Sequence, residues 1–392
     1  MAQGFSKFKR DLEIAWTPNP ATGAAAAFLW GPRQTGKSTL LRERFPDALW
    51  LDLLDTQLSA ELSVRPHSLR ERVLAAAPEV VVVDEVQQAP ALLDEVHWLL
   101  ENTGTRFVLC GSSARKLRRV SRNLLGGRAV DFHLLPLTSH EIGNVDLLRL
   151  LEHGALPPHY LVDDPRQLLR AYVDNYLKQE IIDESATRNV PAFGRFMQVL
   201  GLTQGQQLNH SNVARETGVS ASTVRNYYQI VEDTLLGFTL EPWRKRSKRR
   251  TVETAKFYLF DTGVANTLHP EGHRFGEGTD RLGQAFEQFI LNELRARIAY
   301  GRLDLPLRYW RTHQGHEVDL IVGDMELAIE CKAAREVRPR DLKGLRALAE
   351  EHTLRRRILV SRDSGPRRTE DGIELIPWQA LCRELWDGAL LG

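Results

Sequence analysis

Cysteine is scarce in this sequence, with three residues among 392, at positions 110, 331 and 382. They are widely separated and form no C-x-x-C pair, so we expect a reducing compartment and no structural zinc site. Long apolar runs are also missing, since none approaches the roughly 18 residues of a membrane helix. The polar segment 1–10 lacks the apolar centre of a secretory signal. We therefore expect a cytoplasmic protein that does not contact membranes.

An excess of charge of one sign is absent too. The sequence has 52 Lys and Arg against 51 Asp and Glu, a net charge of +1. This balance excludes a general attraction to nucleic acid, so any DNA binding must depend on local clusters of cations. With 42% hydrophobic and 26% charged residues the composition is that of a globular protein. The length predicts about two or three domains.

The clearest motif, Gly31-x-x-x-x-Gly36-Lys37-Ser38, lies between an apolar run of strand length at 24–30 and a segment of helical periodicity at 38–45. Its glycines let backbone N–H groups surround a phosphate at the positive end of the helix. We expect Lys37 to reach the β- and γ-phosphates of ATP and Ser38 to ligate Mg²⁺. The predicted nucleotide-binding residues are Gly31, Pro32, Arg33, Gln34, Thr35, Gly36, Lys37, Ser38 and Thr39.

Two acidic residues follow a run of four valines at 80–83. Such a run predicts a strand buried on both faces of a parallel sheet, with Asp84 and Glu85 at the edge where ligands bind. We expect Asp84 to hold Mg²⁺ through water and Glu85 to orient or deprotonate the attacking water. The next predicted strand, 106–111, ends at Ser112, whose hydroxyl can sense the γ-phosphate.

This order of strand, carboxylate pair, strand and polar residue resembles the AAA-type ATPases. Four further features in order resemble a bacterial and archaeal family of ATP-binding proteins: Gly126-Gly-Arg128, the segment 132–138, His153-Gly-Ala-Leu-Pro157 and a helical segment at 172–182. Members of this family join an AAA-type ATPase to a C-terminal domain of unassigned function with a restriction-endonuclease-like core. The similarity runs from about residue 28 to about residue 350. It implies an α/β fold with a parallel-sheet P-loop domain, and it supplies no substrate.

A basic stretch follows Ser112, and its cations are Arg115, Lys116, Arg118, Arg119, Arg122 and Arg128. An arginine that reaches across a subunit interface would stabilise the charge of the transferring phosphate. We select Arg128 for this role, and we expect the chain to self-associate into a ring or partial ring. A solvated helix face is an equally good interpretation of the other five cations.

The middle of the chain predicts a helical lid over 166–185 and then a winged helix. Helices are expected at 193–202, 209–217 and 220–231, and the short turn 218–220 between the last two is typical of a helix-turn-helix. Ser222, Thr223, Arg225 and Asn226 stand near the start of the third helix, where side chains would face a DNA groove.

Six cations stand in the seven residues 244–250, between two predicted strands. This is the position of a wing tip, and we predict phosphate contacts by Lys245, Arg246, Lys248 and Arg249. Six such contacts would give a salt slope of about −5. Two alternatives remain open, because winged helices also bind proteins and a run of charge is often only a solvated loop.

Near the C-terminus, Asp319 and Glu330-x-Lys332 lie in two strand-like segments around a short turn at 323–326. If residues 322 and 327 pair, Asp319 faces Glu330 and Lys332 shares their face of the sheet. Two facing carboxylates can hold Mg²⁺, and the lysine could activate a water. Together with Glu287 on the preceding helix, these residues are the set of a restriction-endonuclease-like nuclease. A solvated ion-pair ladder or an inactive nuclease core remains an equal alternative.

The predicted organisation is a leader (1–20) that begins with a helix at 5–14, an AAA-type P-loop domain (21–160), a helical lid (161–202), a winged helix (203–270) and a restriction-endonuclease-like α/β domain (276–392). Two functions remain open. The first is an ATP hydrolase that binds and acts on DNA. The second is a nucleotide-switched signalling or scaffold protein whose C-terminal domains bind protein partners and have no nuclease activity.

Overall fold

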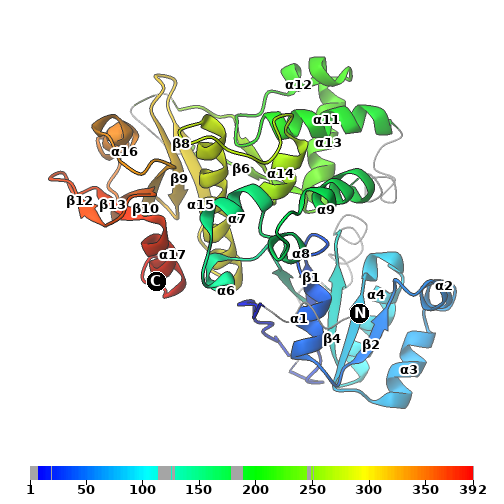
Figure 1. The fold of residues 1–392 in the computed structure, drawn as a ribbon. Helices are drawn as coiled ribbons and strands as arrows, with labels where there is room; N and C mark the ends of the chain where they lie inside the picture. The colour runs from blue at the N-terminus through cyan, green and yellow to red at the C-terminus, as the bar shows by residue number, and fades with distance from the viewer. Residues whose placement is uncertain are drawn as a thin grey trace.

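The computed structural model describes residues 8–18, 20–113, 125, 129–177, 189–244, 249 and 251–391. Figure 1 shows the N-terminal sheet with its helices in blue and cyan, a group of green helices next to it, and a second sheet that runs from yellow to red. Within the described residues, no helix combines the length and the apolarity that crossing a bilayer requires.

The N-terminal sheet is parallel, as the valine run predicted. Its strand order is β2-β3-β4-β1-β5, and all its pairs are parallel. The strands are β1 (Ala25–Trp30), β2 (Leu49–Asp52), β3 (Val80–Asp84), β4 (Arg106–Gly111) and β5 (Ala129–His133). The helices are α1 (Lys37–Arg44), α2 (Thr56–Val64), α3 (Ser68–Ala76) and α4 (Leu92–Asn102). All five residues of β3 are buried, because helices pack on both faces of the sheet.

The predicted helix over 5–14 is wrong for the residues that the structure describes, since 8–14 contain no helix. Arg10 and Leu12 are both buried, at 5% and 1% exposure. A helix would turn residues two apart toward different faces. Leu12 packs into the core cluster of the α1 face of the sheet, together with Leu40 and Leu41. Tertiary contacts therefore override the local helical pattern.

Short helices connect the first sheet to a helix-turn-helix. They are α6 (Ser139–Ile142), α7 (Leu147–His153), α8 (Pro157–Tyr160) and α9 (Arg166–Ala171). The long helix predicted over 166–185 differs in the structure, because α9 passes into a wider π-helical turn at Tyr172–Leu177. Tyr172 is buried there against the rings of His159 and Phe260. Residues 178–188 of this prediction lie outside the described residues.

The helix-turn-helix module (residues 190–260) has the order of elements expected for a winged helix. It consists of α11 (Val190–Leu202), α12 (His210–Thr217), α13 (Ala221–Asp233), β6 (Gly237–Leu240) and β7 (Lys256–Leu259). The turn between α12 and α13 begins at Gly218, with φ 71°, and the Ser220 side chain caps α13 by accepting from the Thr223 N–H at 3.1 Å. β6 and β7 form an antiparallel hairpin, and α14 (Thr262–Leu268) follows.

The C-terminal sheet is mixed, with the strand order β12-β13-β11-β10-β9-β8. Its strands are β8 (Leu307–Arg311), β9 (Glu317–Val322), β10 (Leu327–Lys332), β11 (Arg356–Ser361), β12 (Arg367–Arg368) and β13 (Glu374–Pro377). Its helices are α15 (Asp280–Gly301), α16 (Lys343–Ala349), which follows a short turn at Pro339–Leu342, and α17 (Trp378–Trp386). Val322 pairs with Leu327 across the β9–β10 turn, which confirms the predicted register.

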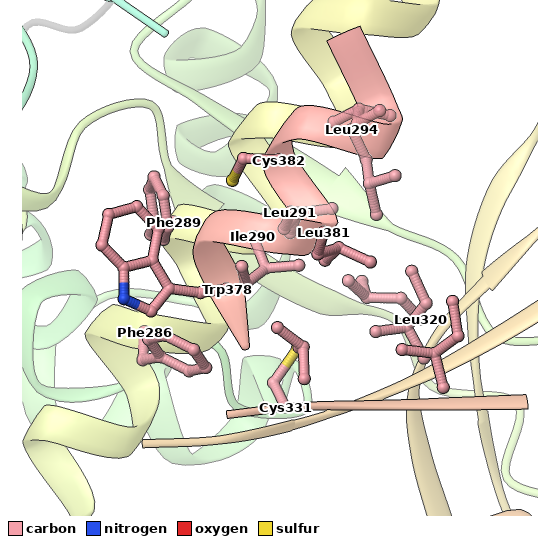
Figure 2. Packing of buried hydrophobic residues seen from close by; sticks show 14 of the residues in the cluster. Phe286, Phe289, Ile290, Leu291, Leu294, Leu320, Cys331, Trp378, Leu381 and Cys382 are labelled. Atoms are coloured by element: carbon pink, nitrogen blue, oxygen red, sulfur yellow. The ribbon is translucent and has the colours of Figure 1, made fainter. Parts of the chain in front are cut away.

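One face of this sheet is covered by α15 and α17. In Figure 2, Phe286, Phe289 and Leu294 of α15 meet Trp378 and Leu381 of α17 above the strands. The same core cluster contains residues of α7 and the buried Tyr160, so the connecting helices pack against the C-terminal domain. The opposite face of the sheet packs against α16.

Candidate functional site

The Gly31–Ser38 loop joins β1 to α1 as the sequence predicted. Gly36 adopts φ 92° and Gln34 adopts φ 63°, a left-handed conformation that only a tight loop requires. Lys37 is buried, and its Nζ donates to the backbone oxygens of Gly31 at 2.8 Å and Pro32 at 3.1 Å. The nine predicted nucleotide-binding residues therefore form one continuous loop and helix start around the Lys37 ammonium.

The two predicted magnesium ligands meet directly. The Ser38 Oγ donates to Asp84 Oδ2 at 2.6 Å, although the residues belong to α1 and β3. Burial raises the pKa of Asp84, and the hydrogen bond from Ser38 opposes this shift. A hydroxyl and a carboxylate side by side are oxygen donors of the kind that Mg²⁺ prefers. The residues present thus fit a magnesium ion at this edge of the sheet.

Glu85 and Ser112 also come together, because β4 lies between β1 and β3. Ser112 Oγ donates to Glu85 Oε2 at 3.2 Å, and Glu85 adopts a left-handed φ of 55°. Sequence reasoning missed a third member, Gln87, whose Nε2 donates both to Glu85 Oε2 and, at 3.2 Å, to Ser112 Oγ. Ser112 and Gln87 thus hold the Glu85 carboxylate at the end of β3.

A small cavity of about 220 Å³ lies next to the loop. Its apolar lining includes Phe8, Leu40, Leu137, Pro157 and Pro158, and it borders Gly36 and Thr39. Flat, apolar groups fill such cavities well, while a few polar atoms fix their orientation. The cavity therefore suits the base of a nucleotide whose phosphates lie in the loop.

Arg10 connects the Gly31–Ser38 loop to distant parts of the chain by hydrogen bonds. Its guanidinium donates to Thr35 O at 2.5 Å, Leu135 O at 2.6 Å, Glu141 Oε1 at 2.9 Å and the hydroxyl of Tyr300, on α15, at 3.1 Å. Sequence reasoning missed Arg10, because nothing in a polar N-terminal segment marks one arginine as buried. The contact couples the Gly31–Ser38 loop to the C-terminal domain.

Part of the predicted set lies outside the described residues, namely Arg128 with the five cations before it, and Lys245, Arg246 and Lys248. Around α13, Ser222 and Arg225 are exposed and Thr223 is half-buried. Arg249 is held within the chain instead. Its Nη1 donates to Ala347 O at 2.9 Å and Glu351 Oε1 at 2.8 Å, and it also pairs with Glu350.

A cleft of about 1030 Å³ lies between α12 and the C-terminal sheet. One wall carries Asn209 and Asn212, and the other carries the predicted nuclease residues. The cations and carboxylates that line it are Lys256, Arg311, Lys332, Arg340, Lys343, Glu287, Glu317, Asp319, Glu330 and Asp341. The structure thus places all four predicted nuclease residues in one cleft, which also faces the helix-turn-helix module.

Asp319 and Glu330 lie next to each other on β9 and β10. Asp319 Oδ2 accepts from the Cys331 N–H at 2.8 Å, and Lys332 Nζ donates to Glu330 Oε1 at 2.5 Å. Burial, together with the charges of Glu287 on Asp319 and of Asp319 on Glu330, raises the pKa of both carboxyl groups. Glu330 Oε2 is buried and has no hydrogen-bond partner among the described residues. An orphaned acceptor beside a second carboxylate fits a divalent cation.

Glu287 is held by two partners that the sequence did not predict. Its Oε1 accepts from Lys256 Nζ at 3.0 Å and from the Tyr258 hydroxyl at 2.5 Å, and both donors belong to β7. The described residues contain no group of three or more His, Cys, Asp or Glu side chains that could hold a metal ion. Lys256 was missed because its partners lie in another domain.

Three family models match the chain in succession. Residues 24–143 match "AAA domain", residues 144–274 match "Domain of unknown function (DUF8612)" and residues 282–381 match "Domain of unknown function (DUF4143)". An uncharacterized protein of Mycobacterium tuberculosis is 28% identical over 307 residues, 76% of this chain and 68% of that protein. An uncharacterized protein of Methanocaldococcus jannaschii is 22% identical over 94% of this chain and 89% of that protein.

Among solved structures, the Aeropyrum pernix ORC1 protein in complex with DNA is 13% identical and covers 62% of this chain and 86% of that chain. The TM-score is 0.28, a value at which the overlay supports no conclusion about this chain. The match of residues 24–143 to the AAA domain agrees with the geometry of the Gly31–Ser38 loop, and neither observation depends on this overlay. Residues 24–143 therefore form a parallel-sheet α/β domain that matches the AAA domain, followed by two segments that match domains of unknown function.

Proposed function

We propose that this protein is a Mg²⁺-dependent ATPase that binds and acts on DNA through its helix-turn-helix module and its C-terminal cleft. The observation that carries the ATPase part is the 2.6 Å hydrogen bond between Ser38 Oγ and Asp84 Oδ2. It joins the phosphate-binding loop to the acidic strand end, which lie 46 residues apart. Ser38 and Asp84 would hold the ion, which supplies charge neutralisation at the phosphates.

The chain's own residues divide the work of hydrolysis. Lys37 exchanges the backbone oxygens of Gly31 and Pro32 for phosphate oxygens, and the loop N–H groups donate to the same anion. Glu85 accepts the proton of the attacking water. Ser112 and Gln87 donate to the Glu85 carboxylate and keep it in place. Self-association into a ring would bring Arg128 of one subunit to the phosphates of the next.

The DNA part of the proposal rests on two surfaces. The exposed start of α13, with Ser222 and Arg225, presents polar side chains at the position of a recognition helix. In the C-terminal cleft, Asp319 and Glu330 would hold a divalent cation, and Lys332 lies against Glu330 where it can position a water for attack on a phosphodiester. A DNA strand held by α12 and α13 would lie against this cleft.

One observation favours a second function. Arg249 ties the segment between β6 and β7 to the end of α16, through ion pairs with Glu350 and Glu351. A wing that is docked in this way suits a nucleotide-switched scaffold, in which ATP binding moves the C-terminal domains and exposes a surface for a protein partner. This alternative needs neither DNA binding nor nuclease activity.

ATPase assays with and without DNA separate the two functions. Several-fold stimulation by DNA supports the first, whereas tight nucleotide retention without stimulation supports the second. Glu85→Gln should keep ATP binding and lower the hydrolysis rate by about 10²- to 10⁴-fold. If calorimetry on the intact chain detects no uptake of ATP or ADP, both functions are refuted.

The DNA contacts can be tested separately. Charge reversal at Lys245, Arg246 and Lys248 should weaken duplex binding in a gel shift and reduce its salt dependence by about 0.9 per lost contact. Reversal at Arg72, an exposed cation of the ATPase domain, is the matched control. Unchanged binding in the triple variant rules out the wing as a DNA contact.

Nuclease activity has its own assay. With Mg²⁺ or Mn²⁺, the intact chain should cleave single-stranded, duplex or branched DNA, and Lys332→Ala should abolish the cleavage. Failure to cleave any of the three forms, or cleavage that persists in Lys332→Ala, rejects the C-terminal cleft as the nuclease site.

A further inference from the structure

Lys256 is a cation from one domain that is buried among the carboxylates of another. It begins β7 of the helix-turn-helix module, its side chain is 5% exposed, and it lines the C-terminal cleft. Its Nζ lies 3.0 Å from Glu287 Oε1 on α15 and 2.8 Å from Glu317 Oε1 on β9, and it also faces the ring of Tyr309. A buried charge persists only when it is paired and hydrogen-bonded, and these contacts meet that requirement.

The position of Lys256 decides which carboxylates of the cleft remain available. Glu287 is occupied by Lys256 and by the Tyr258 hydroxyl, and Glu317 is occupied by Lys256 and by Arg311 at 3.1 Å. A lysine that bridges two carboxylates from different elements supplies the positive charge that a metal ion would otherwise supply between them. These two side chains are therefore not open to a cation.

Glu330, unlike Glu287 and Glu317, has one buried carboxylate oxygen that no described residue pairs with. Lys332 holds its Oε1, while its Oε2 is buried without a hydrogen-bond partner among the described residues. Asp319, whose Oδ2 accepts the Cys331 N–H, lies beside it. The unmet acceptor marks Asp319 and Glu330 as the place in the cleft where a cation is still required.

We propose that Lys256 is a built-in cation of the C-terminal cleft: it neutralises Glu287 and Glu317 and so leaves the cleft with one divalent-cation site, formed by Asp319 and Glu330. This inference rests on the cation site of the proposed function and assigns to Glu287 a role other than ligation. It also makes the cleft dependent on the helix-turn-helix module, because β7 supplies the neutralising charge.

Counting bound Mn²⁺ tests the proposal. The intact chain is used without nucleotide and with Asp84→Asn, which removes the predicted ion at the phosphate-binding loop. We expect one Mn²⁺ per chain by titration calorimetry and Mn²⁺ electron paramagnetic resonance. Lys256→Met, which keeps the length of the side chain and removes its charge, should bind two. Lys256→Arg is the matched control and should bind one.

Two results separate this inference from the proposed function. One Mn²⁺ in both the parent chain and Lys256→Met overturns the role of Lys256 and leaves the metal site of the proposed function intact. No Mn²⁺ in the parent chain overturns both.

A second variant keeps the proposal open to refutation if Lys256→Met fails to fold. Glu287→Gln should still bind one Mn²⁺ per chain, because Glu287 is not a ligand, whereas Asp319→Asn should abolish binding. Loss of the bound Mn²⁺ in Glu287→Gln overturns the proposal.

Discussion

Replacement of Arg10 by alanine should destabilise the N-terminal domain more than replacement of any exposed arginine of that domain. The guanidinium is 5% exposed and donates to Thr35 O, Leu135 O and Glu141 Oε1. Burial disfavours its charge, yet Tyr300 and Glu141 outweigh that effect and raise the pKa of Arg10. Removal leaves the buried Thr35 carbonyl and the part-buried Leu135 carbonyl without the Arg10 donor, and it takes one donor from the buried Glu141 carboxylate.

The magnitude follows from burial. Breaking a buried ion pair by removing one partner costs about 3–5 kcal/mol. We expect Arg10→Ala to fall at the lower end of this range, since Glu141 keeps the backbone N–H groups of Asp11 at 2.8 Å and Thr138 at 3.0 Å. The control is Arg72→Ala, because Arg72 and Glu61 form an exposed pair, at 42% and 41% exposure. Such pairs contribute about 0–1 kcal/mol.

Urea denaturation gives the free energy of unfolding of both variants, and hydrogen exchange locates the effect. Peptides that cover residues 31–41 should exchange faster in Arg10→Ala, because the Thr35 carbonyl has lost its donor, while in Arg72→Ala they should be unchanged. If Arg10→Ala costs no more than Arg72→Ala, or if exchange in the loop is unaltered, then the buried network does not fasten the phosphate-binding loop.

Three further predictions concern single side chains. Lys37→Ala should abolish ATP uptake in calorimetry without unfolding the chain, and unchanged uptake would disprove the nucleotide site. Gly31→Ala should lower the thermal midpoint and weaken ATP binding, because a Cβ there would lie 2.4 Å from Leu134 O; a midpoint and affinity equal to those of the parent chain would contradict the structure. Burial raises the pKa of Glu293 from 4.5 to about 7, so the folded state retains a proton that the unfolded state releases, and stability falls as pH rises from about 4.5 to 7. Relative to Glu293→Gln, the parent chain should lose up to about 3 kcal/mol over that range, whereas urea midpoints that keep a constant difference from pH 4.5 to 8 would refute this.

Local patterns predicted several elements correctly because the physics there is local. The valine run specified the buried strand β3, and the short turn after Val322 specified the register that brings Asp319 toward Glu330. Gly218 and Ser220 marked the end of one helix and the start of the next, because a left-handed residue and a capping hydroxyl act within a few residues.

The same local reasoning was wrong where tertiary contacts compete. The polar N-terminal segment has a helical pattern, yet Arg10 and Leu12 are both buried, which a helix would not allow. The described part of the helix predicted over 166–185 is helical, but it widens to a π-helical turn at Tyr172, which packs against the ring of His159 in α8 and that of Phe260 just after β7.

The sequence by itself determined the Gly31–Ser38 loop, the acidic end of β3 and the position of the carboxylates on the C-terminal hairpin, since each depends on residues close together in the chain. Only the tertiary structure decided which distant side chains complete these sites. Arg10 meets Glu141 across 131 residues, and Lys256 meets Glu287 across 31 residues and between two domains. Such pairs follow no sequence period, because they depend on how whole elements pack.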